Sequence, residues 1–192
     1  MTPAARRRLP ALLLLTDPER TPDPVAAVLA LPRGAGVVFR AFGAKDGLQT
    51  GLALRRACRA RGLTLLVGTD PALARAIGAD GAHLPERLAW RAGAIRRARP
   101  GWIVTAAAHS GRAIRRARRA GAEAVLLSAV FESSSPSAGR PLGPVRFAAL
   151  ARGAGLPVYA LGGVNMKTAP RLGGSGAAGL AAVEALAGAG GR

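Results

Sequence analysis

Short apolar runs alternate with amphipathic stretches along the chain, and this alternation is the main structural signal in the sequence. The apolar runs predict eight strands, at 11–16, 36–40, 63–68, 81–84, 102–108, 124–130, 157–162 and 177–183. The amphipathic stretches, rich in alanine and arginine, predict eight helices, at 22–31, 46–61, 71–77, 86–98, 111–119, 144–153, 165–173 and 184–189.

Continuous apolar strands separated by helices indicate a parallel sheet that is buried on both faces. Eight such units close into a compact (β/α)₈ TIM barrel. The chain has 192 residues, which is slightly short for this fold, so its loops must be tight and its helices brief. An open doubly wound sheet with fewer strands is the alternative. We expect one domain over residues 1–192, with loose termini at 1–8 and 188–192.

An internal repeat supports the barrel. The segments "AIGADGAHL" (76–84), "RAGAEAVLL" (119–127) and "GSGAAGLAA" (174–182) share one form, in which a glycine ends a helix and small residues lead into the next strand. They precede the fourth, sixth and eighth predicted strands, as in a barrel grown from βαβα quarters. Chance similarity in a chain rich in alanine and glycine is the competing explanation.

The chain carries a formal net charge of +18, almost all of it from arginine, with Lys45 and Lys167 as its only lysines. The arginines are spread over several predicted helices, and aromatic residues make up 4% of the chain. A specific nucleic-acid site gathers basic residues on one face and adds aromatics for stacking. We therefore interpret the arginines as solvated helix faces. A protein that binds polyanions through its charge stays open as a separate class.

One cysteine, Cys58, excludes an internal disulfide and a cysteine-built metal site, and we expect it on the inner face of a helix. No apolar run reaches the ~18 residues that cross a membrane. Arg6–Arg8 before "LPALLLL" faintly resembles a signal peptide, but Asp17 and Glu19 follow and a buried first strand fits better. We expect a cytoplasmic protein without a specific nucleic-acid or membrane partner; assembly into a homo-oligomer is left open.

Polar residues gather where the predicted strands end, which is where (β/α)₈ enzymes have their active sites. Arg40 ends the second strand, His83 lies in the fourth and His109 ends the fifth. Half of the ten acids also follow strands: Asp17, Asp70, Glu86, Glu132 and Glu184. Acids at helix starts also interact favourably with the helix dipole, which accounts for Asp70 and Glu86 without a function.

Two loops on this rim suit an anion. The segment "LLSAVFESSSPSAGRPLG" (126–143) carries four serines after a strand, and "ALGGVN" (160–165) places Gly162 and Gly163 at the end of the seventh strand. Carboxylates, arginine, hydroxyl groups and bare backbone together fit a Mg²⁺–phosphate ligand. A tight turn is the other explanation for the glycine pair. No set of residues suits a nucleophilic triad or a zinc site.

Several segments, taken in order, resemble the thiamine phosphate synthase / TenI family. They are "LLLLTDPER", "GVVFRAFGA", "LVGTDPALARAIGADGAHL", "AAHS", "RRARRAGAEAVLLSAVFESSSPSAGRPLG", "PVYALGGV" and "GAAGLAAVEAL". The family's synthase joins hydroxymethylpyrimidine diphosphate to a thiazole phosphate and releases pyrophosphate and thiamine phosphate. The resemblance implies phosphorylated pyrimidine and thiazole substrates and a Mg²⁺ cofactor.

The resemblance also implies roles for residues at matching positions. Arg40 would contact pyrophosphate, Asp70 would bind Mg²⁺, and Ser133 and Ser135 would replace two threonines of the pyrophosphate loop. Gly162 and Gly163 would meet the thiazole phosphate. Supporting roles fall to Glu86 as a second metal ligand and to His83, His109 and Arg140 as substrate-binding residues.

The chain departs from the family pattern at several of these positions. Two family lysines fall on Phe42 and Pro136, and a metal-binding aspartate falls on Leu88. A family glutamine, asparagine and serine fall on Val38, Thr69 and Glu184. Three functions therefore stay open. They are a divergent synthase, a TenI-like thiazole tautomerase, and a barrel that has lost catalysis and only binds a phosphorylated thiamine precursor. The TenI histidine falls on Ala129, so His83 or His109 would move protons in the tautomerase.

Overall fold

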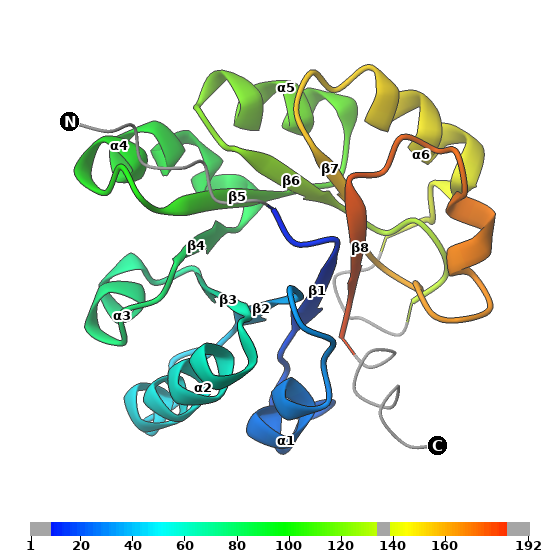
Figure 1. Ribbon diagram of the computed structural model, residues 1–192. Helices are drawn as coiled ribbons and strands as arrows, with labels where there is room; N and C mark the ends of the chain where they lie inside the picture. The colour runs from blue at the N-terminus through cyan, green and yellow to red at the C-terminus, as the bar shows by residue number, and fades with distance from the viewer. Residues whose placement is uncertain (1–8, 134–138, 184–192) are drawn as a thin grey trace.

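The computed structural model describes residues 9–133 and 139–183. Eight strands form one closed parallel sheet in chain order, and hydrogen bonds between β8 and β1, with Leu13 opposite Ala181, close the ring (Figure 1). This confirms the (β/α)₈ barrel and excludes the open sheet. The strands are β1 (Leu12–Leu15), β2 (Gly36–Phe39), β3 (Thr64–Gly68), β4 (Gly81–Leu84), β5 (Ile103–Ala108), β6 (Ala124–Leu127), β7 (Val158–Ala160) and β8 (Gly179–Ala182).

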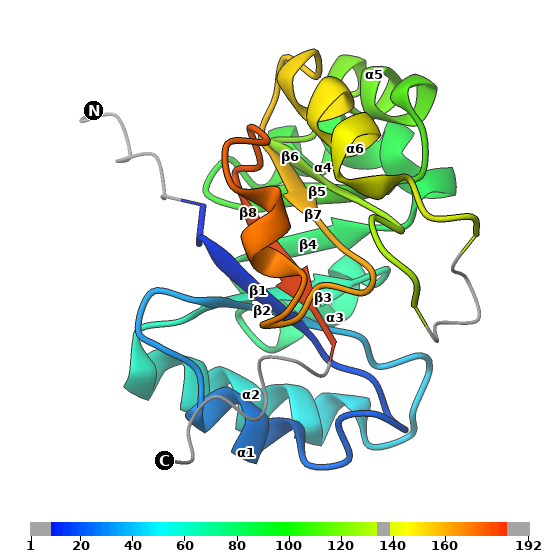
Figure 2. The same cartoon turned by 90° about the vertical axis from the view of Figure 1, so that its right-hand side faces the viewer.

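Helices surround the sheet on the outside, and Figure 2 shows α1 and α2 lying together beside β1 and β2. The helices are α1 (Pro24–Leu29), α2 (Gly47–Arg61), α3 (Pro71–Ala76), α4 (Ala92–Ala98), α5 (Gly111–Arg119) and α6 (Gly143–Arg152). Two 3₁₀ helices complete the ring, η1 (Glu86–Arg91) and η2 (Ala169–Leu172). The predicted helix 184–189 and the predicted loose termini lie outside the described residues.

Most predicted elements are one to several residues shorter in the structure, such as strand 157–162, which is Val158–Ala160, and three differences have a local explanation or a consequence for the site. The predicted helix 86–98 begins as η1 and becomes α-helical only at Ala92. The predicted helix 165–173 is wrong apart from η2, because the Asn165 side chain accepts the backbone N–H groups of Lys167 and Thr168 and fixes a turn there. The predicted strand 124–130 ends at Leu127.

Burial on both faces explains the apolar strands. Side chains at alternate positions, such as Leu13 and Leu15, fill the barrel interior, whereas Leu14 packs outward toward α1 and α2. Tyr159 is fully buried inside the barrel and donates a 2.6 Å hydrogen bond to the carbonyl of Pro10. Burial raises the pKa of Tyr159 to about 12. A Cβ atom on Gly179 would lie 2.6 Å from the Tyr159 ring, so only glycine leaves room for it.

Glycines in the three repeated segments have positive φ angles, which suits the turns that were expected there. Gly78 and Gly121 follow α3 and α5 with φ of +66° and +90°, and Gly176 precedes β8 with φ of +84°. The left-handed conformations of Gly78 and Gly121 end a helix, and that of Gly176 lies in the turn that leads into β8; glycine adopts all three without strain.

Cys58 lies on the inner face of α2, fully buried, as expected. Burial raises the pKa of its thiol to about 12, so the group is an inert part of the core. None of the helices in the described part of the chain is both long and apolar enough to cross a membrane.

Candidate active site at the mouth of the barrel

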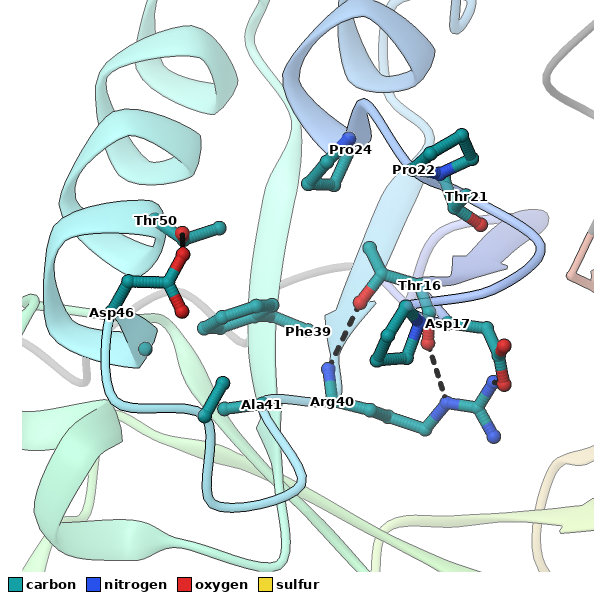
Figure 3. Close-up of a pocket in the computed structure, with 13 residues that line it drawn as sticks. Thr16, Asp17, Thr21, Pro22, Pro24, Phe39, Arg40, Ala41, Asp46 and Thr50 are labelled. Atoms are coloured by element: carbon teal, nitrogen blue, oxygen red, sulfur yellow. Dashed lines mark hydrogen bonds and ion pairs between the residues drawn. The ribbon is translucent and has the colours of Figure 1, made fainter.

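Arg40 follows β2 and is fixed by the end of β1. Its backbone N–H donates to Thr16 Oγ1 at 3.0 Å, its Nε donates to the Thr16 carbonyl at 2.7 Å, and its Nη2 donates to Asp17 Oδ2 at 3.0 Å (Figure 3). Its Nη1 donates to no acceptor among the described residues, and the side chain is 22% exposed. One edge of the guanidinium is thus held and the other is free for a ligand.

Asp17 is the anion that holds Arg40. Burial alone would raise the pKa of Asp17, but hydrogen bonds from Arg20 and the charges of Arg20 and Arg40 outweigh burial and lower the pKa below its usual value. The carboxylate therefore stays ionised at neutral pH, and both arginines pair with its Oδ2 atom.

The Arg40 side chain lies over the end of the neighbouring strand, β3. A Cβ atom on Gly68 would lie 3.1 Å from Arg40 Cγ, so the missing side chain lets Arg40 pass close to the β3 backbone. Two residues later the chain presents Asp70. Thr69, between them, has φ of +68°, a strained conformation for a β-branched residue. Strain of this kind is concentrated at functional sites.

Asp70 is exposed and begins α3. Its Oδ1 accepts the backbone N–H groups of Ala72 and Leu73, both at 2.9 Å. Its Oδ2 has no partner among the described residues. The helix-cap explanation of Asp70 is therefore correct for one oxygen and leaves the other available.

His83 lies inside the barrel on β4 and is 7% exposed. Its Nδ1 is 2.9 Å from Thr105 Oγ1 on β5. Burial, assisted by the charge of Arg40, lowers the pKa of His83 to about 4. The imidazole is neutral at pH 7 and lies below the mouth as part of the barrel packing.

Glu86, which follows β4, and His109, which follows β5, form a hydrogen-bonded pair outside the barrel interior. Glu86 Oε2 accepts both the backbone N–H of His109, at 3.0 Å, and a 2.8 Å hydrogen bond involving His109 Nδ1. Glu86 Oε1 accepts Arg116 Nη2 of α5 at 3.0 Å. Both carboxylate oxygens are used, so Glu86 would have to leave these partners to bind a metal ion. Among the residues that the structure describes, no three histidine, cysteine or acidic side chains are grouped for a metal.

Gly162 and Gly163 follow β7 with φ of +89° and +64°. Phe131 donates its N–H to the Gly162 carbonyl at 3.0 Å, and a Cβ on Gly162 would lie 2.8 Å from Ala129 Cβ. The N–H groups of Gly162, Gly163 and Val164 donate to no protein acceptor in the described ranges. The pair therefore joins the loops after β6 and β7 and leaves three N–H groups unpaired.

The serine-rich loop is tied at its two ends. Leu142 and Gly143 donate their N–H groups to the carbonyls of Ala129 and Val130, both at 2.9 Å. Ser133 is half-buried on one side of the loop, and Arg140 is exposed on the other. Ser135 lies outside the described residues, so its predicted role stays a prediction.

Two hydroxyl groups that organise this site were missed by the sequence reasoning. Thr16 holds Arg40, and Thr105 holds His83. Each lies in or just after an apolar strand, and a single threonine there is expected simply from its preference for strands. The position of Thr16 directly before Asp17 was the one available signal.

Residues 12–186 match the family model described as thiamine monophosphate synthase. The chain is 33% identical over 195 residues to the thiamine biosynthesis bifunctional protein ThiM/ThiE of Symbiobacterium thermophilum, covering 98% of this chain and 40% of the relative. It is 34% identical over 196 residues to the thiamine-phosphate synthase of Alcanivorax borkumensis, covering 94% and 87%. The chain thus spans less than half the length of the two-function relative.

A solved structure, thiamine phosphate pyrophosphorylase from Pyrococcus furiosus, superposes with a TM-score of 0.76. The superposition covers 92% of this chain and 87% of that one at 23% identity, which supports the fold alone. The family model covers most of the chain and the relatives exceed 30% identity, so the chain belongs to the thiamine monophosphate synthase family.

Proposed function

We propose that this chain is a transferase that joins hydroxymethylpyrimidine diphosphate to thiazole phosphate, forming thiamine phosphate and pyrophosphate. The observation that carries the proposal is the placement of Arg40 across Gly68, beside the strained turn that presents Asp70. A guanidinium with a free edge and a carboxylate with a free oxygen, after two neighbouring strands of the barrel, suit a diphosphate and its counter-ion.

Arg40 would bind the diphosphate through Nη1 while Thr16 and Asp17 hold its other edge. A side chain fixed in advance loses little entropy when it meets its ligand, and its charge stabilises the pyrophosphate as it leaves. Departure of pyrophosphate leaves a pyrimidine cation that the thiazole nitrogen captures. The protein acts mainly by holding the leaving group and orienting the two rings.

The residues present fit Mg²⁺ in a limited way. Magnesium is commonly held by one or two carboxylates together with substrate phosphates and waters, and Asp70 offers one unpaired carboxylate oxygen. When bound, the ion would neutralise charge on the departing pyrophosphate. Glu86 would join only after leaving His109 and Arg116, so Asp70 is the main ligand in this proposal.

Gly162, Gly163 and Val164 would bind the phosphate of the thiazole. Successive N–H groups from residues with positive φ form a concave anion site, and the loops after strands seven and eight are the usual phosphate position in this fold. Ser133, Ser135 and Arg140, from the segment after β6, would bind the pyrophosphate. The proposal also includes a cytoplasmic location and small phosphorylated substrates as partners.

The test is an assay with both substrates and Mg²⁺ that detects thiamine phosphate. Asp70→Asn keeps a good helix cap because asparagine also accepts backbone N–H groups, so it removes the charge without removing the cap. We expect its turnover to fall at least a hundredfold. Asp23→Asn, the same change at the cap of α1, is the matched control and should keep wild-type turnover. Equal activity of the two variants, or no product from the wild type, would contradict the proposal.

A thiazole tautomerase is the second candidate, and the Glu86–His109 pair favours it. A carboxylate that accepts Nδ1–H of a histidine leaves Nε2 free to take a proton. A tautomerase would convert a thiazole carboxylate phosphate without diphosphate or Mg²⁺, and His109→Gln would abolish the conversion. Loss of synthase activity in Asp70→Asn with full tautomerase activity would separate the two functions.

A further inference from the structure

A pocket lies beside the mouth, outside the barrel interior, between the loop from β1 to α1 and the loop from β2 to α2. We call it the side pocket. Its volume is about 190 Å³, and Phe39, which points outward from β2, forms one surface of it. Arg40 and Asp17 lie at its border with the mouth. Apart from Thr16, which holds Arg40, the proposed synthase reaction uses none of the remaining lining residues.

The side pocket has polar groups on opposite walls and apolar surface between them (Figure 3). Asp46 and Thr50 lie on one side, Thr16 and Thr21 on the other, and Phe39 lies between them. Three prolines and two alanines supply further apolar lining: Pro18, Pro22, Pro24, Ala41 and Ala44. A flat apolar body with a polar group would match this arrangement.

Thr21 is the residue that points to a ligand. It lines the side pocket, it is only 4% exposed, and its Oγ1 makes no hydrogen bond to any residue that the structure describes. A buried hydroxyl without a partner costs free energy, and such groups are rare in native proteins. A bound molecule with a hydrogen-bonding group would remove this cost.

Asp46 gives the pocket its charge. It occupies the cap position of α2, but its side chain makes no capping hydrogen bond; instead Oδ2 accepts the hydroxyl of Thr50 at 3.1 Å. Oδ1 has no partner among the described residues. Asp17, the other carboxylate of the lining, is already paired with Arg20 and Arg40. Asp46 is therefore the acceptor available to a ligand.

The segment that forms the pocket has no net formal charge, although the protein as a whole is strongly basic. Residues 17–46 contain four acids, Asp17, Glu19, Asp23 and Asp46, against four cations, Arg20, Arg33, Arg40 and Lys45. A carboxylate next to apolar surface attracts a cation and repels phosphate. We propose that the side pocket binds a small protonated amine whose flat apolar body carries a second polar group, with the ammonium on Asp46, the ring against Phe39 and the second polar group on Thr21. At ~30 Å³ per water, the volume equals about six waters and holds one ring with one amine.

Benzylammonium is a suitable probe because it carries one ring and one ammonium. Binding to the full chain is measured by amide chemical shifts at Thr21, Gly47 and Thr50, with no substrate present. We expect saturable shifts at these residues and at least tenfold weaker binding of benzyl alcohol, which lacks the charge. Excess pyrophosphate should leave the binding unchanged, which separates this site from the proposed diphosphate site. No saturable shift, or displacement by pyrophosphate, would overturn the inference.

Three variants test the contacts. Asp46→Asn removes the charge at constant size and should weaken benzylammonium binding at least tenfold. Thr21→Val removes the unpaired hydroxyl, so its free form should be at least as stable as the wild type. Because the single ammonium of benzylammonium lies on Asp46, across the pocket from Thr21, this variant should bind the probe at least as tightly as the wild type does. Glu19→Gln, in the same loop but outside the lining, is the control and should bind as the wild type does. Equal affinity of Asp46→Asn and Glu19→Gln would refute the ammonium contact.

Discussion

The Asp17 carboxylate and the Arg40 guanidinium are joined by a 3.0 Å hydrogen bond that links the end of β1 to the end of β2. Arg20 donates to the same carboxylate oxygen at 3.1 Å. Asp17 therefore fixes the position of Arg40. It pairs with Nη2 and leaves Nη1, the nitrogen that would face a ligand, without a partner among the described residues.

Asp17→Asn should weaken pyrophosphate binding and reduce kcat/KM about tenfold because Arg40 loses its charged support. Stability should fall by about 1–3 kcal/mol at neutral pH. The measurement is product formation together with urea unfolding. Glu19→Gln, an exposed carboxyl of the same loop, is the control. If both variants behave as the wild type, Asp17 does not position Arg40.

The same variant should change the response to acid. The pKa of Asp17 in the folded protein lies below its usual value of 3.8, so its stabilising effect is complete above that value and is lost as the pH falls through the folded pKa. Asp17→Asn should lose less stability than the wild type below about pH 4. Urea unfolding at pH 6 and pH 3 gives the comparison, and parallel losses would contradict it.

His83, a basic group, leads to a second prediction for how the free energy of unfolding depends on pH. Its pKa falls from 6.5 when unfolded to about 4 when folded, so the unfolded chain binds the proton first. Stability is complete above pH 6.5 and is lost as the pH falls toward 4, by about 3 kcal/mol at full extent. His83→Gln should remove most of this loss.

The chain has only two histidines, which makes the measurement direct. Proton NMR of the ring protons should show one histidine titrating near pH 4, and that signal should vanish in His83→Gln. His109→Gln should leave it in place. A His83 signal titrating near pH 6.5 would show that the ring is not held neutral by burial.

The fold could be predicted because the barrel buries both faces of each strand, so every strand becomes an apolar run that is visible in the sequence. The internal repeat added the positive-φ glycines at Gly78, Gly121 and Gly176. Helix 165–173 could not be predicted correctly, because one side chain, Asn165, competes with the helix by bonding to the nearby backbone.

The site was predictable at the level of residues that follow strands, since parallel strands bring their carboxyl ends to one rim. The hydrogen bonds between these residues were not predictable. Glu86 and His109 are 23 positions apart, and whether their side chains meet depends on their rotamers and on Arg116 of α5, which also binds Glu86. The hydrogen-bond partner of His83, Thr105, becomes its neighbour only when β4 pairs with β5.

Gly163→Ala should test how the loops after β6 and β7 depend on their close approach. Gly163 has φ of +64°, and a Cβ there would collide with the Glu132 carbonyl and lie 2.7 Å from Phe131 Cβ. Gly174→Ala is the matched control, because Gly174 has φ of +66° but no atom within 4 Å of the added Cβ. The control should cost about 1 kcal/mol for the left-handed backbone alone.

Gly163→Ala should cost at least about 2 kcal/mol more than this control, because the backbone has to shift. Urea unfolding measures both variants. The phosphate of the thiazole should also bind more weakly to Gly163→Ala, with no change in Gly174→Ala. Similar stabilities of the two variants would mean that the loops separate easily at this point.

Phe42 offers a prediction in the direction of increased activity. It is 67% exposed, has φ of +49°, and its ring lies 5.1 Å from the Arg40 guanidinium carbon. A lysine of the family pattern falls on this position. Phe42→Lys would place a second cation beside Arg40, and we expect kcat/KM for the diphosphate substrate to rise about tenfold. Phe42→Leu removes the ring without adding charge and should show no rise. An equal increase in both variants would mean that the ring obstructs the mouth and that charge is not what the position lacks.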